Sequence, residues 1–568
     1  MKKHILLTIS SGLLLFTGCV DLNLDPLYED TSENWFSNER QMTMSVNDFY
    51  RHNYWYFEVN RFSHTDRWSD DWNQRDYLYD WLQGNYTSDF KQVHDTWFGF
   101  YGGVTRANTV LSKIRDMRGK GVIAEDKLDI FEGEASFFRA CFYTYLVFLH
   151  GDVPFYTEYL YIEDAFQIGR TDKAVVMEQV YKDFDRAAEL LPKTHSSAFA
   201  DINRVTKGAA YGWKARAAIW QSDWATAAEA AKDCMDLGVY SLHTSFRNLF
   251  LKSTRVSPEH IFVLPRSKEI MDDAAASKSR LPRNVGGQAV AQPSWELMCA
   301  YLDTQGKPID KSSIYNPRKP FENRDPRMKE TMVEPGTEWL GFVWSPTTKT
   351  TLNVATGGQV TNNDSRLNAR DASYNGMCLK KGVDESWITA FDEDASYVLL
   401  RYADVLLMYA EAKMELNQID NTVLAAINEV RARAYNGTGL TSPKVTTTNQ
   451  DELRTVIRME RRMELAWENR RWFDLIRWRL AEVACARPLY CYPQGDDLQT
   501  IINNGDYLFP SSPLPTIDKD GLVDLSPLYD AGKVIIINQR GFQERQYLMP
   551  IPDTELILCP NLTQNEGY

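Results

Sequence analysis

The densest set of side chains that could bind a ligand lies in residues 67–77, RWSDDWNQRDY. Aromatic rings are interleaved there with carboxylate, amide and guanidinium groups. A sugar ring has an apolar C–H face and a rim of hydroxyls, so it needs a flat ring to stack on and polar groups at its edge. The segment therefore predicts carbohydrate binding, although the same tryptophans could simply pack a loop onto a scaffold. The candidate residues are Trp68, Asp71, Trp72, Asn73, Arg75 and Tyr77.

One such contact does not make a tight site. Covering about 100 Å² of sugar face contributes only about 2.5 kcal/mol. Several contacts are therefore needed, and we expect an affinity in the micromolar to millimolar range. Secondary candidates lie in a later polar stretch, where Trp339 could equally be structural. They are Arg283, Asn284, Trp339 and Trp344.

The sequence offers little for catalysis or for a cofactor. It contains no G-x-S-x-G, no H-E-x-x-H and no glycine-rich phosphate loop, and its eight histidines form no H-x-x-x-H pair. Adjacent acids such as Asp70 and Asp71 could serve a glycosidase, but adjacency does not set the carboxylate separation that hydrolysis needs. We expect no enzyme activity, no cofactor and no metal. A loop cation held by Asp392, Glu393 and Asp394 stays open as an alternative.

Cys19 follows a short export signal. Lys2 and Lys3 precede an apolar run over residues 5–16, which is too short to span a bilayer and suits a signal peptide. Thr17 and Gly18 then lead into the cysteine, which is the pattern of a lipoprotein signal, although Phe16 stands where leucine is usual. We expect acylation of Cys19 to anchor an otherwise soluble chain. A secretory signal with an incidental cysteine is the alternative.

The net charge and the spacing of the cysteines argue against nucleic-acid binding, a zinc site and a redox motif. With 63 basic and 77 acidic residues, the net charge of −14 makes nucleic-acid binding a poor hypothesis. The other seven cysteines show no C-x-x-C spacing, so neither a zinc site nor a redox motif is indicated. Whether Cys485 pairs with Cys491 is left open.

Helical periodicity dominates two blocks of the chain. Apolar residues recur at spacings of three and four over residues 128–149, which predicts an amphipathic helix that ends at Gly151. Residues 175–237 are rich in alanine and glycine and suggest stacked helical hairpins of the tetratricopeptide type. In the second block, the alternating charges of residues 458–478 predict one long helix whose Arg–carboxylate pairs lock it to its neighbours.

The predicted fold is mainly α, a tetratricopeptide-like scaffold with a large irregular subdomain and few short strands. The predicted organisation is a signal peptide (1–18), a lipidated leader (19–34), an N-terminal helical part (35–239), an irregular ligand-binding insertion (240–396), a second helical block (397–480) and an irregular C-terminal region (481–568).

Several segments, in order along nearly the whole chain, resemble the SusD/RagB family of surface nutrient-binding lipoproteins. They are FEGEASFFRACFYTYLVFLHGDVPFY (131–156), PSWELMCAYLDTQGKPI, FENRDPRMKETMVEPG, LRYADVLLMYAEA (400–412), MERRMELAWENRRWFDLIRW (459–478) and the C-terminal YLMPIPDTELILCPNLTQNEGY (547–568).

The resemblance implies a non-catalytic protein of the outer membrane, facing the cell exterior, that captures oligosaccharides. It also implies a partner, a SusC-like TonB-dependent β-barrel that receives the ligand. A surface enzyme that cleaves glycans, or a family member that binds peptides or glycopeptides, remains the alternative.

Overall fold

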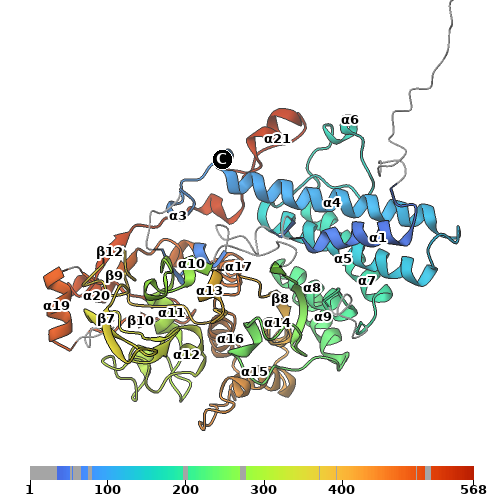
Figure 1. Cartoon of the computed structure of the whole chain (residues 1–568). Helices are drawn as coiled ribbons and strands as arrows, with labels where there is room; N and C mark the ends of the chain where they lie inside the picture. The colour runs from blue at the N-terminus through green and yellow to red at the C-terminus, as the bar shows by residue number, and fades with distance from the viewer. Residues whose placement is uncertain are drawn as a thin grey trace, which may run out of the picture.

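The computed structural model describes residues 35–51, 54–55, 65–74, 80–195, 203–268, 277–369, 371–391, 393–493, 495–505 and 513–568. The signal peptide, Cys19 and the leader therefore lie outside the described residues, as do Arg75 and Tyr77. The fold is mainly α-helical with few short strands, as the sequence predicts. Long helices gather on one side of the molecule, and short strands and loops gather on the other (Figure 1).

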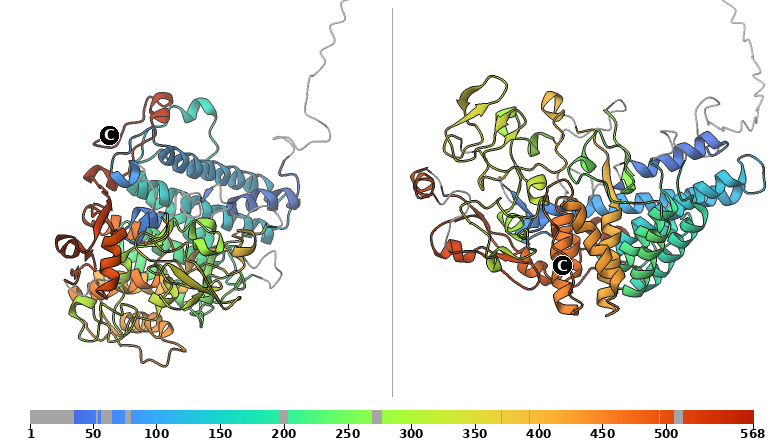
Figure 2. Two further views of the ribbon diagram at one scale, coloured as in Figure 1. Left: turned by 60° about the vertical axis from the view of Figure 1, so that its left-hand side comes forward. Right: turned by 90° about the horizontal axis from the view of Figure 1, so that it is seen from below.

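The N-terminal helical part is built from helices that lie side by side (Figures 1 and 2). The periodic segment forms a helix that Gly151 ends with a positive φ of 74°, a conformation that glycine adopts without strain. Each of the next three long helices is capped at its N-terminus by a side chain that accepts a backbone N–H group. These side chains belong to Asp172, Thr206 and Asp223. These helices are α1 (Glu39–Asn47), α4 (Lys91–Met117), α5 (Glu125–His150), α7 (Lys173–Leu190), α8 (Lys207–Trp220) and α9 (Trp224–Asp236).

Small residues let these helices approach closely. A Cβ on Gly133 of α5 would lie 3.2 Å from Cβ of Leu190, the last residue of α7, so a larger residue there would push the two helices apart. The second block consists of α14 (Tyr402–Glu415), α15 (Asn421–Ala434), α16 (Gln450–Glu464) and α17 (Arg471–Arg477).

The prediction of one long helix over 458–478 is wrong. The chain leaves the helix between α16 and α17, where Trp467 and Asn469 have φ values of 62° and 60°. Residues other than glycine seldom adopt this region, so tertiary contacts must hold it. One such contact is the Asn469 backbone N–H, which donates to Asp66 Oδ2 at 2.9 Å. The carboxylates before the break pair with buried arginines, and the helix ends there.

The strands form small antiparallel sheets. β2 (His260–Leu264) pairs with β8 (Tyr397–Arg401), which leads directly into α14. The other pairs are β1 (Trp72–Gln74) with β3 (Ala291–Pro293), β9 (Leu489–Cys491) with β12 (Ile535–Asn538), and β10 (Thr516–Ile517) with β11 (Val523–Asp524). A four-stranded sheet joins β4 (Glu338–Trp339), β5 (Phe342–Val343), β6 (Thr350–Asn353) and β7 (Gly358–Thr361).

Short helices complete the loop-rich side and the chain end. Ser294 caps α11, and Pro552 precedes α21, as the sequence indicates for both helix starts. They are α3 (Asp80–Gln83), α6 (Ile162–Ala165), α10 (Ser277–Arg280), α11 (Trp295–Ala300), α12 (Arg327–Thr331), α13 (Trp387–Ala390), α18 (Ala481–Ala484), α19 (Gly495–Asn503), α20 (Ser526–Asp530) and α21 (Asp553–Leu558).

A buried group of charges lies where the helical blocks meet the loop-rich side. We call it the Arg401 ion cluster, and it comprises Glu259, Arg401, Arg433, Glu464 and Glu468. Arg401 donates to Glu259 at 2.7 Å and to Glu464 at 2.6 Å, and all three side chains are buried. The cluster joins β8, α15 and α16, so the predicted structural role of the signature arginines and carboxylates agrees with their placement.

Within the described part of the chain, no helix has the length and apolarity needed to cross a membrane. The seven cysteines described are buried, and none forms a disulfide, so Cys485 and Cys491 are not paired in this structure.

Candidate ligand-binding site

The two tryptophans of the predicted platform lie inside the packed core. The Trp68 ring stacks on Trp81 with a centroid distance of 4.2 Å and meets the edge of Trp472 at 5.2 Å. Trp72 stacks on Trp467 at 4.2 Å. Both indoles are buried, with 5% and 6% of their surface exposed. Ligand contact by these rings stays a prediction, and Trp68 borders a small cavity of about 300 Å³, counting open space, together with Trp81 and Trp472.

The polar candidates beside them bind protein groups. Asp71 accepts from Arg462 Nε at 2.8 Å, and the Asn73 amide donates to the Tyr490 carbonyl at 3.1 Å. Both side chains are buried. The segment that the sequence suggested as a sugar platform is therefore fastened to α16 and β9.

The secondary candidates are placed in the loop-rich region. The Asp364 carboxylate accepts the backbone N–H groups of Arg283 and Asn284 at 2.7 and 3.0 Å, and the Asn284 amide donates to Asn362. Trp339 and Trp344 are buried in the core of this region. Their role in ligand binding stays a prediction.

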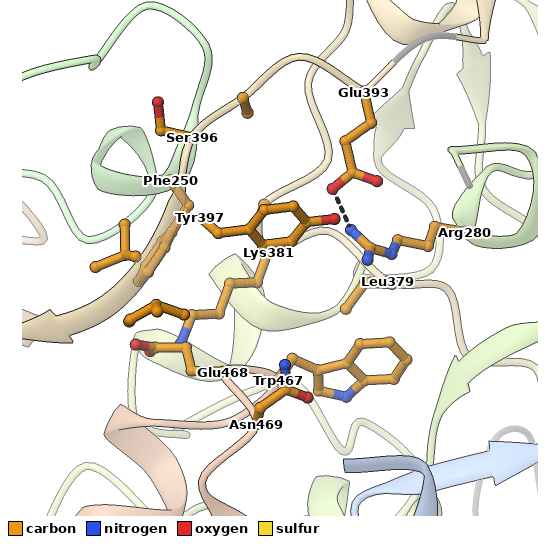
Figure 3. A pocket seen from close by; sticks show the side chains of 14 residues that line it. Phe250, Arg280, Leu379, Lys381, Glu393, Ser396, Tyr397, Trp467, Glu468 and Asn469 are labelled. Carbon is orange, nitrogen blue, oxygen red and sulfur yellow. Dashed lines mark hydrogen bonds and ion pairs between the residues drawn. The ribbon is translucent and has the colours of Figure 1, made fainter. Parts of the chain in front are cut away.

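A different set of residues surrounds a concave surface beside β8, which we call the Tyr397 cavity (Figure 3). It measures about 690 Å³, counting the space open to solvent. Five parts of the chain bring its walls together: the turn that ends at Phe250, α10, the segment 379–382, the segment 393–399 and the break between α16 and α17. Its principal side chains are Phe250, Arg280, Lys381, Glu393, Tyr397, Trp467 and Glu468.

Aromatic rings supply the apolar part of the cavity. Arg266 covers one face of Tyr397 at 4.3 Å, and Trp72 covers one face of Trp467. Only the remaining face of each ring is left for the cavity, where Phe250 lies close to the Lys381 stem (Figure 3). Trp72 thus supports a cavity residue from behind.

Charged groups are held in fixed pairs around these rings. Arg280 Nη1 lies 2.8 Å from Glu393 Oε1, and the Tyr397 hydroxyl points toward the same guanidinium (Figure 3). Lys381 Nζ donates to Glu468 Oε1 at 2.5 Å and to the Glu464 carbonyl at 3.0 Å. Burial lowers the pKa of Lys381 to about 8, against the opposing effect of Glu468. Burial and the Glu393 charge raise the pKa of Tyr397 to about 12, so its hydroxyl stays a hydrogen-bond donor.

The cavity suits a neutral polar ligand with an apolar face. Two cations and two carboxylates line it, so their formal charges cancel. Glu393 Oε2 is buried and has no hydrogen-bond partner in the described structure, which leaves an acceptor for a ligand hydroxyl. Such an arrangement provides stacking, donors and an acceptor, but no isolated charge to attract an ion.

The loop-cation alternative gains no support from these contacts. Glu393 pairs with Arg280, and Asp394 pairs with Lys252, while Asp392 lies outside the described residues. Across the described ranges, no group of three or more histidine, cysteine or acidic residues is arranged to hold a metal ion.

The sequence does not single out the cavity residues. Tyr397 was predicted to begin a helix, and Trp467 to lie within one. Both positions acquire their role from a strand pairing and a helix break that depend on distant contacts. The run of aromatic and charged residues WEN at 467–469 is a local sign, but the same letters fit a helix equally well.

A helical scaffold that holds an aromatic cavity with paired charges defines a ligand-binding protein rather than a structural repeat alone. The model of the SusD family matches residues 258–568, and a model described as "Starch-binding associating with outer membrane" matches residues 32–219. The chain therefore belongs to the SusD family, as the resemblance predicted.

Individual relatives agree with this assignment. SusD-like protein P25 of Formosa agariphila is 28% identical over 68% of this chain and 70% of its own, and SusD-like protein P2 of the same organism is 25% identical over 93% and 100%. A crystal structure of a SusD-like carbohydrate-binding protein from Bacteroides fragilis has a TM-score of 0.76 at 24% identity, covering 93% of this chain and all of that one. At that identity the likeness shows a common fold.

Proposed function

We propose that this protein is a non-catalytic surface receptor for a neutral oligosaccharide, which it binds in the Tyr397 cavity. The observation that carries the proposal is the combination of ring faces with internally neutralised charges in one concave surface. Relatives of the same fold include one titled a carbohydrate-binding protein and one titled a laminarin-binding SusD-like protein, the latter with a TM-score of 0.57.

The proposal places the receptor at the outer membrane, anchored by lipid on Cys19 and facing the exterior. The description of the matching N-terminal family model, which names the outer membrane, supports this location. A bound oligosaccharide then passes to a SusC-like TonB-dependent transporter as partner. Support for the partner comes from family membership.

The chemistry of the cavity favours binding over cleavage. A glycosidase needs one carboxyl group that is protonated and can donate to the leaving oxygen. Burial alone would raise the pKa of Glu468, but Arg401 and Lys381 outweigh it and lower that pKa. Glu393 is tied to Arg280. Neither carboxylate is placed as a free proton donor.

Binding is tested by calorimetric titration of the purified protein with a panel of neutral oligosaccharides. We expect one class to bind with a Kd between micromolar and millimolar, and Tyr397→Ala to weaken it at least tenfold because a stacking face is lost. Tyr161→Ala is the matched control, since that tyrosine is 69% exposed and lies outside the cavity.

Chromatography of the same mixtures distinguishes the alternatives. Intact oligosaccharide after incubation supports the receptor. Shortened products would replace it with a glycan-cleaving enzyme, and binding of peptides without any sugar would replace it with a peptide receptor.

A further inference from the structure

A second concave surface lies on the neighbouring strand of the same small sheet. β2 contributes to it, while its partner β8 lines the Tyr397 cavity. We call it the Arg255 cavity, and it measures about 720 Å³ counting open space, similar to the first. Its principal polar side chains are Lys193, His195, Arg204, Tyr240, Arg255 and His260.

The charge of this second cavity is positive. None of its described lining residues is a carboxylate. Glu134 neutralises Arg204 through two hydrogen bonds of 2.7 and 2.9 Å. Arg255 lies 3.9 Å from Asp394, which also pairs with Lys252, so one carboxylate serves two cations. Lys193 and Arg255 therefore leave a net positive charge at the cavity, in contrast to the balanced pairs of the Tyr397 cavity.

His260 adds a buried polar group. Burial lowers the pKa of His260 to about 4, so the ring is neutral at pH 7 and keeps one N–H donor and one acceptor. The Leu249 backbone offers His260 one hydrogen-bonding interaction, and the ring provides at most one further polar atom to a ligand in the cavity.

The rest of the lining is mixed, with Thr194, Asn203, Thr206 and Ser257 beside an apolar wall. Val239, Pro258, Ile261 and Val263 border the cavity, and Val256 beside them is 53% exposed. The cavity thus combines cations and a donor with an apolar wall, which matches a ligand that carries both a negative group and a C–H face.

We propose that the Arg255 cavity binds an anionic oxygen group carried by a sugar, either a carboxylate or a sulfate ester. Arg255 Nη1 donates to the Arg266 carbonyl at 3.1 Å, and the remaining N–H groups of its guanidinium are donors for the oxygens of such a group. The apolar wall takes the face of the sugar ring. The anion site stands on the cavity itself, whereas the sugar as carrier rests on the proposed function.

Calorimetry with glucuronate, glucose 6-sulfate, inorganic sulfate and glucose at constant ionic strength tests this inference. We expect both sugar anions to bind at least tenfold more tightly than glucose, and more tightly than inorganic sulfate. The ratio between the two identifies the preferred group. Arg255→Gln is expected to weaken both at least tenfold, and Lys193→Gln to weaken them less because that lysine is exposed.

Matched variants show where the anions bind. Arg318→Gln makes the same charge change on an exposed side chain outside both cavities and should leave anion binding intact. Tyr397→Ala should also leave it intact. Equal affinities for glucose and its acids, or loss of anion binding in Tyr397→Ala but not in Arg255→Gln, would overturn the proposal. If the protein still bound neutral oligosaccharides in that case, the proposed receptor function would remain valid.

Discussion

The charges of the Arg401 ion cluster depend on one another for their ionisation. Burial alone would raise the pKa of Glu464, but Arg433, Arg401 and Arg327 together hold it well below the usual range. Arg327 Nη1 lies 2.9 Å from Glu464, which ties α12 to α16 as well. Removing the Glu464 charge therefore takes one partner from three buried arginines at once, although each keeps another carboxylate, whereas removing a surface charge disturbs no buried group.

We expect Glu464→Gln to lower the free energy of unfolding by about 3–5 kcal/mol, because the amide keeps the shape but not the charge. Urea denaturation followed by circular dichroism measures the change. The control is Lys319→Gln, which breaks an exposed pair with Glu322 and should leave the midpoint where it is. Equal midpoints for both variants would contradict a stabilising role for the cluster.

His150 gives the pH dependence of stability a defined sign. Burial lowers the pKa of His150 to about 3, so the folded chain leaves it neutral where the unfolded chain protonates it. The unfolded state then binds more protons as the pH falls below about 6.5, and stability decreases toward pH 3.

Between pH 7 and pH 5, the titration of His150 should lower the free energy of unfolding of the wild type by about 2 kcal/mol. The His150→Gln variant should not show this loss. Urea denaturation of both proteins at the two pH values gives the difference, in which contributions from all other groups cancel. Parallel pH profiles would show that His150 titrates normally in the folded chain.

At the scale of elements, contacts between helices decide whether a glycine is needed. Gly102 and Gly103 are neighbours in α4. A Cβ on Gly103 would lie 2.5 Å from Phe142 Cδ2 of α5, whereas a Cβ on Gly102 would meet, among the described residues, only Tyr54 Cε1 at an ordinary 3.6 Å.

We expect Gly103→Ala to destabilise the fold by about 1–3 kcal/mol, since the ring of Phe142 must move. Gly102→Ala should stabilise it by about 0.5–1 kcal/mol, because alanine loses less entropy in a helix. The thermal midpoints of the two variants should shift in opposite directions. Shifts of the same sign would mean that α4 and α5 are not packed as described.

Periodicity was sufficient for α5 and for α7 to α9, because their apolar spacing, N-caps and terminal breakers act within a few residues. It failed at Trp467, because the break after α16 is fixed by Asp66 and Trp72, about 400 positions away in the chain. Whether the candidate residues bind a ligand stays a prediction, which their composition alone does not settle. Trp68 and Trp72 have the composition of a sugar platform, but composition does not tell which ring faces are already covered.

In the whole molecule, β8 lines the Tyr397 cavity and its partner strand β2 lines the Arg255 cavity. Two weak sites joined by one oligosaccharide bind it more tightly than either alone, provided that the chain can reach both.

The proposed lipid anchor is useful because the expected binding is weak. An affinity between micromolar and millimolar releases ligand quickly, so capture is useful only where a transporter is close by. We expect Cys19→Ser to leave the Kd for oligosaccharide unchanged in solution, because the residues that line the Tyr397 cavity lie from Phe250 to Asn469 in the chain. The same change should abolish incorporation of labelled fatty acid and reduce growth on the oligosaccharide at least tenfold at limiting concentration. Full growth with an unlipidated chain would contradict the tethered receptor, whereas a loss of affinity would instead implicate the N-terminal segment in folding.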